Sequence, residues 1–449
     1  MQINKCAIVQ QIEKTIQHLE SHLALANVHM VDYFHKDIFI KHIPENIQEE
    51  VNSCGFHNAI QAIHDQQTKH LPNLHQYIQK SMQLCLKNTS ICMSFDQFRT
   101  RLEKLGCKQI SHFKLDIFMK PKKSHEVEVL SGAVAAVHDI ADTTHIIDIG
   151  DGKGYLSSML ALHYKIPVLG VDASETNTNG AVNRANKLSK VWNGVVTNVH
   201  THKTSIDLYK QITKYVDETI DFKELVSNIF LESSERIGLV GLHTCGDLAA
   251  NCLKIYNKHN DIKMICNVSC CYNHLTEHLG KERIGFPLSN LIREKKFILN
   301  RGARMIAAQS IERILHLKER PSKTIFYRAI FEILIQQSPS DVKKTQVGRF
   351  RKESSNFVDY ARKAAGRINL PLEQSDTDIS ALYSKFEHRQ DEMDLFYLLR
   401  AMLAPVVESV VLLDRLLFLY ENGHTESYLV QFFDPVVSPR CYGIVSIKI

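Results

Sequence analysis

The chain has 449 residues, of which 44% are hydrophobic and 23% are charged. Its length exceeds one average domain, and its hydrophobic content excludes a disordered chain. The net charge of +5 permits a nucleic-acid partner without requiring one, and the eleven cysteines are scattered rather than spaced as a disulfide framework. Because the first 20 residues contain no apolar signal core, we expect a soluble, non-secreted, reduced protein of the cytoplasm or nucleus.

The N-terminal part of the chain is predicted to be helical. Apolar residues recur at helical spacing from Ile12 to Leu23, and a second amphipathic run covers residues 74–86. We assign residues 1–118 to this helical region, to which the sequence attaches no function.

Short apolar runs alternate with helical stretches from about residue 144 onward. The runs "HIIDIG", "PVLGVDAS", "GVVTNV", "IGLVGLH" and "MICNVSCC" are separated by helical segments. This alternation predicts an α/β fold with a mainly parallel sheet, and the uniformly apolar strands suit burial on both faces. We assign residues 119–286 to this core.

The C-terminal half is predicted to contain a helical insertion, residues 287–409, followed by strands in residues 410–449. We expect these strands to complete the same sheet as an antiparallel edge. Within the insertion, residues 343–367 carry eight lysines and arginines against two acids, which suits phosphate contact or a solvated surface. The apolar run Phe396–Tyr420 contains four charged residues and a proline, so we predict no membrane span.

The segment "DIGDGKGYL" carries the most information about a ligand. An apolar strand ends at Asp148, and the three glycines that follow let the backbone approach a ligand closely. Tyr155 stands where a dinucleotide fingerprint needs its third glycine, and Lys153 lacks the Ser or Thr that follows the lysine of a phosphate loop. The pattern D-x-G-x-G-x-G is instead similar to the first motif of class I S-adenosylmethionine-dependent methyltransferases.

An acid at the tip of the second strand supports a nucleoside ligand. Asp172 lies 22 positions after Gly150, where an acid hydrogen-bonds ribose hydroxyls in nucleoside-binding folds. Upstream, Lys123 and His125 of "KPKKSHEV" are candidates for the cofactor's carboxylate, and Glu126 suits a first helical turn. The predicted S-adenosylmethionine site comprises Lys123, His125, Asp148, Gly150, Asp151, Gly152, Lys153, Gly154 and Asp172.

Two further strand tips are expected beside the cofactor loop. The segments "GLHTCGDLA" and "NVSCCYNHLTE" end the next two strands of the core, and ligands bind beyond the carboxyl ends of such strands. The expected catalytic residues are His243, Cys270, Cys271, Tyr272 and Asn273.

Three roles stay open for the two adjacent cysteines. A cysteine nucleophile would suit methylation of a pyrimidine carbon. A metal site could draw also on His243, Cys245, Cys266 and His274, but no C-x-x-C pair exists, and we predict no metal ion. The simplest interpretation makes the cysteines small, reduced residues that shape a substrate slot.

Several motifs occur in an order that resembles the methyltransferase-like protein 25 family, whose relatives include a protein named for a ribosomal RNA adenine dimethylase domain. They are "KPKKSHEV", "DIGDGKGYLS", "VGLHTCGDLA", "SCCYNHLTE" with "FPLS", and "LAPVVESVVLLDRLLFL". The resemblance covers about residues 110–449 and implies a class I methyltransferase, Rossmann-like, with S-adenosylmethionine as its cofactor.

The resemblance does not deliver the methyl acceptor. An adenine-N6 methyltransferase typically carries N-P-P-[YF] where this chain has "HTCGD", so adenine dimethylation is not carried over. The family naming and the basic insertion favour an RNA acceptor. A protein acceptor, or a catalytically silent scaffold that binds S-adenosylmethionine, is the alternative.

Overall fold

The structure is a computed structural model that describes residues 4–107, 110, 113, 119–195, 205–232, 234–337 and 347–448. The chain forms two compact units. Unit 1 comprises Met1–His18, Gln83–Ser310 and Pro405–Ile449, and unit 2 comprises Leu19–Met82 and Ile311–Ala404.

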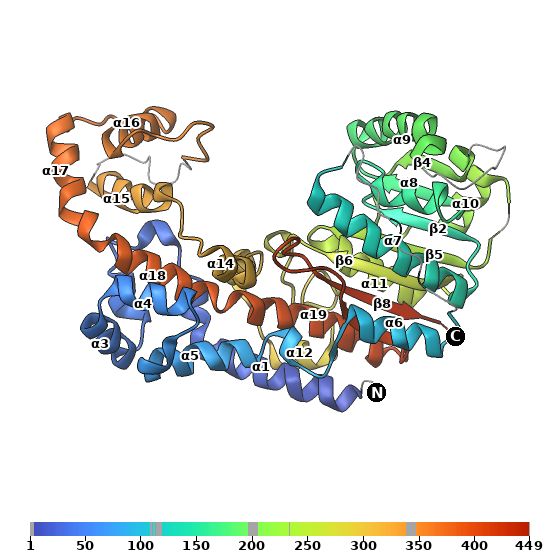
Figure 1. Cartoon of the computed structure of the whole chain (residues 1–449), viewed down its shortest axis with the longest axis horizontal. Coiled ribbons are helices and arrows are strands. Elements are labelled where there is room, and N and C mark those ends of the chain that lie inside the picture. Colours follow the sequence, from blue (N-terminus) through green and yellow to red (C-terminus); the bar gives the residue numbers. More distant parts are fainter. Residues whose placement is uncertain are drawn as a thin grey trace. The chain divides into compact units, whose positions relative to one another are not determined.

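Unit 1 is built on an eight-stranded sheet with the order β1-β7-β8-β6-β5-β2-β3-β4. Figure 1 labels β2, β4, β5, β6 and β8 of this sheet. Strand β8 pairs antiparallel with β6 and β7, and the other neighbouring strands pair parallel. The structure therefore confirms a mainly parallel α/β sheet. The strands are β1 (Cys92–Ser94), β2 (His145–Ile149), β3 (Val168–Asp172), β4 (Tyr209–Thr213), β5 (Ile237–Thr244), β6 (Ile262–Ser269), β7 (Ser427–Gln431) and β8 (Tyr442–Ile447).

The antiparallel strand lies inside the sheet rather than at its edge. The two C-terminal strands do join the sheet, but β8 stands between β6 and β7, and every residue of β8 is buried. The outer edge is β1, which comes from the region predicted to be helical and pairs Cys92 with Leu429 of β7. The prediction that the C-terminal strands form the edge of the sheet is therefore wrong, because the three-residue strand β1 pairs with β7 and forms that edge.

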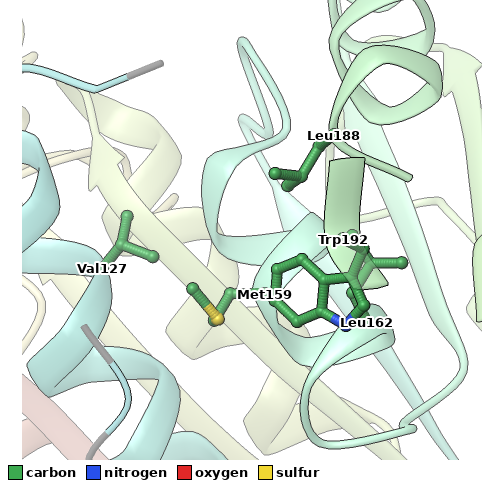
Figure 2. Packing of buried hydrophobic residues seen from close by; sticks show 5 residues of the cluster. All are labelled: Val127, Met159, Leu162, Leu188 and Trp192. Atoms are coloured by element: carbon green, nitrogen blue, oxygen red, sulfur yellow. The ribbon is translucent and has the colours of Figure 1, made fainter. Parts of the chain in front are cut away.

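The helices of unit 1 pack around the sheet, and three of them share one apolar cluster. Figure 2 shows this cluster, in which α7, α8 and α9 contribute Val127, Met159, Leu162, Leu188 and Trp192, the single tryptophan. The cluster packs α7 and α9 against α8, the helix that follows the glycine segment. The helices are α6 (Phe95–Lys104), α7 (Pro121–Ala141), α8 (Tyr155–Leu162), α9 (Glu175–Val195), α10 (Phe222–Phe230), α11 (Asp247–Lys258), α12 (Asn290–Lys295), α13 (Asn300–Ile306) and α19 (Ala404–Glu421), with α1 (Lys5–Ala26) and α5 (Pro72–Gln83) crossing the unit boundary.

The strand predicted for the apolar run "GVVTNV" is not tested by the structure. Helix α9 extends to Val195, and residues 196–199 of "GVVTNV" lie outside the described residues. The strand that pairs with β3 is β4, whose tip supplies part of the site described below.

Unit 2 is helical in its described residues and combines two distant segments of sequence. The hydroxyl of Tyr77 donates a hydrogen bond to the carbonyl of Leu399 at 2.8 Å, and Arg400 donates to the carbonyl of Ala26 at 3.0 Å. The N-terminal helical region and the helical insertion, assigned separately from the sequence, both contribute to it. Its further helices are α2 (Ile38–His42), α3 (Glu45–Cys54), α4 (Phe56–His64), α14 (Ile311–Leu317), α15 (Lys323–Gln337), α16 (Phe357–Arg367), α17 (Asp376–Phe386) and α18 (Gln390–Ala401).

One helical stretch, Asp376–Glu421, is long and apolar enough to cross a membrane by length and composition. Of its most apolar window, 89% is buried inside the structure. A core helix passes the same test, so this stretch is weak evidence for a membrane span.

Candidate active site

The glycine segment forms a left-handed turn between β2 and α8. Gly150, Gly152 and Gly154 have φ angles of 74°, 60° and 66°, a region that side chains with a Cβ rarely adopt. A Cβ on Gly154 would also collide with the hydroxyl of Tyr209. The backbone conformation therefore requires glycine at these three positions. Because glycine has no side chain, the backbone of this turn is exposed to a pocket.

Two pockets meet at Gly150. The first, of about 240 Å³, is lined by Lys123, the loop, Tyr155, Leu242 and His243. The second, of about 280 Å³, is lined by the tips of β3, β4 and β5, including Asp172, Tyr215 and Cys245. Both lie at the carboxyl ends of parallel strands, where ligands bind in open α/β sheets. Together they form an elongated site with a cation at one end and an acid at the other.

Asp172 occupies the position that the sequence assigned to a ribose ligand. Its carboxylate accepts hydrogen bonds from the N–H groups of Gly152 (3.0 Å) and Ser174 (2.8 Å) and from the Asn177 amide (3.1 Å). These hydrogen bonds hold the carboxylate beside the glycine turn, and Asp172 lines the second pocket.

Asp148 and Asp151 form a buried pair of acids beneath the turn. Ser157 lies between them, with its hydroxyl 2.9 Å from Asp148 and 2.7 Å from Asp151, and Tyr209 donates to Asp151. Burial and the charge of Asp151 raise the pKa of Asp148, and burial also raises the pKa of Asp151. Two acids in such proximity favour sharing a proton, which limits the negative charge that the pair places under the pocket.

A buried carboxylate joins the start of α7 to the tip of β5. Glu126 is fully buried, and its Oε2 lies 2.5 Å from Nζ of Lys123 and 3.0 Å from Nε2 of His243. Burial alone would raise the pKa of Glu126, but His243 and Lys123 hold it well below its usual range. His243 sits at an irregularity in β5 with φ 72°. A strand bulge re-aims a side chain, and here it turns His243 into the first pocket.

Three thiols lie together where β5 and β6 end. The Sγ atom of Cys245 is 3.2 Å from that of Cys270 and 3.3 Å from that of Cys271. Hydrogen bonding with Cys270 lowers the pKa of Cys245 to about 6, whereas the same hydrogen bond and burial raise the pKa of Cys270. Burial also raises the pKa of Cys271. Cys245 is therefore the thiol that ionises most readily, and the two predicted from the sequence ionise less readily.

Six predicted residues line neither pocket: Gly154, Cys270, Cys271 and the three described next. Tyr272 is 1% exposed, and its hydroxyl donates to Glu408 at 2.8 Å, which places it in the core. The carbonyl of Asn273 accepts a hydrogen bond from Arg304. His125 accepts one from the N–H of Asp434 at 3.3 Å. The structure thus brings together Lys123, His243, Asp172 and the glycine segment.

The sequence missed Ser157, Tyr209 and Tyr215. Ser157 falls in the first turn of the helix after the glycines, a position that could have been found from spacing. Tyr209 is the first residue of β4 and Tyr215 follows the strand. Both were missed because "GVVTNV" was predicted to be the third core strand. Tyr215 is 72% exposed at the second pocket, where its ring is available for stacking.

Comparison with known proteins agrees with this geometry. A family model described as a methyltransferase domain matches residues 122–278. "Probable methyltransferase-like protein 25" of Mus musculus is 26% identical over 98% of this chain and 96% of its own length. The Homo sapiens protein of that name is 27% identical over 81% of this chain and 80% of its own length. These matches support the resemblance to the methyltransferase-like protein 25 family that the order of the motifs predicted.

A solved structure, coclaurine N-methyltransferase bound to N-methylheliamine and SAH, is 12% identical and matches 89% of this chain and 96% of that chain. Its TM-score of 0.23 is too low to carry an argument.

The chain is therefore a class I, Rossmann-like methyltransferase, and S-adenosylmethionine is its cofactor. The residues present fit that molecule. Lys123 suits the carboxylate of its amino-acid end, Asp172 suits its ribose hydroxyls, and Tyr215 with Val216 suits its base. Because the glycines between these groups have no side chains, the cofactor can contact the backbone of the turn directly.

Proposed function

We propose that this methyltransferase acts on RNA. The observation that carries the proposal is a group of lysines at the first pocket, where Lys123 and Lys153 line the pocket and two further lysines precede Lys123. Lys120 and Lys122 are exposed at the start of α7, and Lys153 is exposed in the glycine segment. A helix start carries partial positive charge and favours acids, yet the first turn of α7 contains none. Concentrated positive charge of this kind suits the phosphates of a nucleic acid.

The basic segment of unit 2 supports the proposal in part. Arg349, Arg351 and Lys352 are exposed. Arg362 pairs with Asp376 at 2.8 Å, and Arg367 donates to two carbonyls of the same unit, so these cations stabilise the unit itself. Lys343 and Lys344 lie outside the described residues. The charge open to a phosphate is therefore smaller than the sequence count indicated.

The residues of the first pocket suit a nucleophile that must lose a proton. When bound, S-adenosylmethionine supplies a methyl group on a reactive sulfonium, so the protein chiefly has to position the acceptor. His243 lines the pocket, and the carboxylate of Glu126, 3.0 Å from its Nε2, orients the ring. All eleven cysteines are free thiols, which fits the expected nuclear or cytoplasmic compartment.

The test is transfer of label from radioactive S-adenosylmethionine into an extract of cells that lack this protein, followed by nuclease or protease digestion. We expect the label to be lost to nuclease. Label lost only to protease would make a protein the acceptor and the proposal wrong.

A charge-reversal variant sharpens the test. In Lys120→Glu/Lys122→Glu, we expect the KM for RNA to rise about 10-fold or more and the salt dependence of binding to flatten by about two phosphate contacts. Affinity for S-adenosylmethionine should stay unchanged. The matched control is Lys187→Glu/Lys190→Glu, two exposed lysines on α9 of the same unit. Equal effects of the two variants on RNA would contradict the proposed role of Lys120 and Lys122.

A further inference from the structure

The three thiols at the tips of β5 and β6 form a nearly equilateral triangle. Their Sγ atoms are separated by 3.2 Å (Cys245 to Cys270), 3.3 Å (Cys245 to Cys271) and 3.3 Å (Cys270 to Cys271). Among the described residues, the possible metal ligands are the side chains of cysteine, histidine and the acids. These three cysteines are the group whose ligand atoms lie close enough together to hold one metal ion. The sequence placed Cys245 at a strand tip next to that of Cys270 and Cys271, and the structure brings the three Sγ atoms into contact.

These separations are those of hydrogen-bonded thiols and not of a disulfide. A disulfide joins two sulfurs at about 2.05 Å. Zinc–thiolate bonds are about 2.3 Å, so an ion could contact all three sulfurs from about 1.3 Å above their plane. Ideal tetrahedral ligands would stand about 3.8 Å apart, so binding would need each pair to separate by about half an ångström.

The backbone that carries the thiols is held by groups other than the thiols. Arg304 donates to the carbonyls of Tyr272 and Asn273 and pairs with Glu277 at 3.0 Å. Asp247 accepts a hydrogen bond from the N–H of Thr276 at 2.7 Å. The triangle is therefore pre-organised, as a ligand set must be if binding is to cost little rearrangement.

We propose that Cys245, Cys270 and Cys271 bind one Zn²⁺ ion. Soft thiolates select zinc over magnesium or calcium, and zinc imposes no electronic geometry of its own. The ion has three protein ligands and one exchangeable position occupied by water. That position faces the second pocket, because Cys245 is the exposed member of the group and lines that pocket.

The ion ties the tip of β5 to the tip of β6 beside the cofactor site. Cys270 is only 6% exposed, so the bound ion is shielded by protein on the β6 side. This site goes beyond the methyl-transfer function and does not depend on the identity of the acceptor.

The first test measures metal in the full chain purified without chelator. We expect about one zinc ion per chain by elemental mass spectrometry. Cys245→Ser and Cys271→Ser should each lower the zinc content at least 5-fold. Cys6→Ser, an exposed cysteine of α1, is the control that should retain it. A chain that carries no zinc and takes none up on dialysis against micromolar Zn²⁺ would overturn the proposal, as would full zinc content in both serine variants.

A second measurement needs no variant and separates metal binding from misfolding. In the purified wild-type chain, Cys245, Cys270 and Cys271 should resist alkylation by iodoacetamide until a chelator removes the metal. Cys6 should react in both states. Full alkylation of Cys245 before chelation, or a disulfide among the three under reducing conditions, would contradict a metal site.

Discussion

Nε2 of His243 lies 3.0 Å from Oε2 of Glu126, although 117 residues separate the two along the chain. Glu126 belongs to α7, which precedes the first core strand, and His243 ends β5. The same carboxylate pairs with Lys123 and accepts a hydrogen bond from Ser438 at 2.6 Å. One buried acid therefore joins Lys123, the C-terminal part of the chain and the histidine that lines the pocket.

Replacing this acid should slow methyl transfer more than it weakens cofactor binding. In Glu126→Gln the side chain keeps its shape but loses the charge that orients His243, so we expect kcat to fall about 100-fold. Affinity for S-adenosylmethionine should change by less than about 5-fold. Steady-state rates and calorimetric titration measure both quantities. Glu128→Gln, two residues along the same helix, is the matched control, and equal kcat values in the two variants would exclude this role.

The glycine turn predicts a specific loss of cofactor binding. In Gly152→Val a β-branched side chain would have to adopt φ near 60°, which costs about 1–3 kcal/mol. Because the variant would relieve this strain by leaving the conformation that binds the cofactor, we expect a rise of about 5- to 150-fold in the Kd for S-adenosylmethionine.

The same substitution at Gly180 of α9 is the control for the glycine turn. A Cβ at Gly180 meets nothing within 4 Å, so calorimetry should find no change. Wild-type affinity in Gly152→Val would mean that the cofactor binds elsewhere.

Arg304 holds the loop that follows β6, so we expect its replacement to disturb the position of that loop. Its guanidinium donates to several loop carbonyls and to Glu277, and a lysine cannot reproduce that fork. Arg304→Lys should reduce kcat at least 10-fold and leave the Kd for S-adenosylmethionine within about 3-fold. Arg301→Lys changes an exposed arginine of the same helix and should leave both unchanged. A rise in Kd without a change in kcat would show that the loop serves the cofactor instead.

Local spacing predicted the glycine turn and Asp172, because both depend on residues within one strand–turn–helix unit. The contact between Tyr209 and Asp151 could not be predicted, since it depends on which segment pairs with β3. The sequence predicted the thiol group only in part. The sequence placed Cys245 near Cys270 and Cys271 at adjacent strand tips, but separations near 3.3 Å follow only from the register of β5 against β6. Unit 2 required long-range helix packing, about which periodicity says nothing.

Asp414 predicts a pH dependence of stability. It is fully buried, and its carboxyl accepts hydrogen bonds from the N–H groups of Leu288 (2.8 Å) and Ser289 (2.9 Å). Burial raises the pKa of Asp414 to about 6, against the effect of these hydrogen bonds. The folded state therefore binds the proton more tightly than the unfolded state does. This contribution to the free energy of unfolding is full below pH 4 and is lost as the pH rises from 4 to 6, by about 3 kcal/mol at most.

Asp414→Asn removes this titration, so its stability relative to wild type should rise between pH 4 and pH 7. Urea unfolding of both proteins at several pH values measures the difference, in which the titrations of all other groups cancel. The control is Asp139→Asn, an exposed acid of α7, whose stability relative to wild type should not vary by as much. A constant difference between wild type and Asp414→Asn would show that Asp414 has the same pKa in the folded and unfolded states.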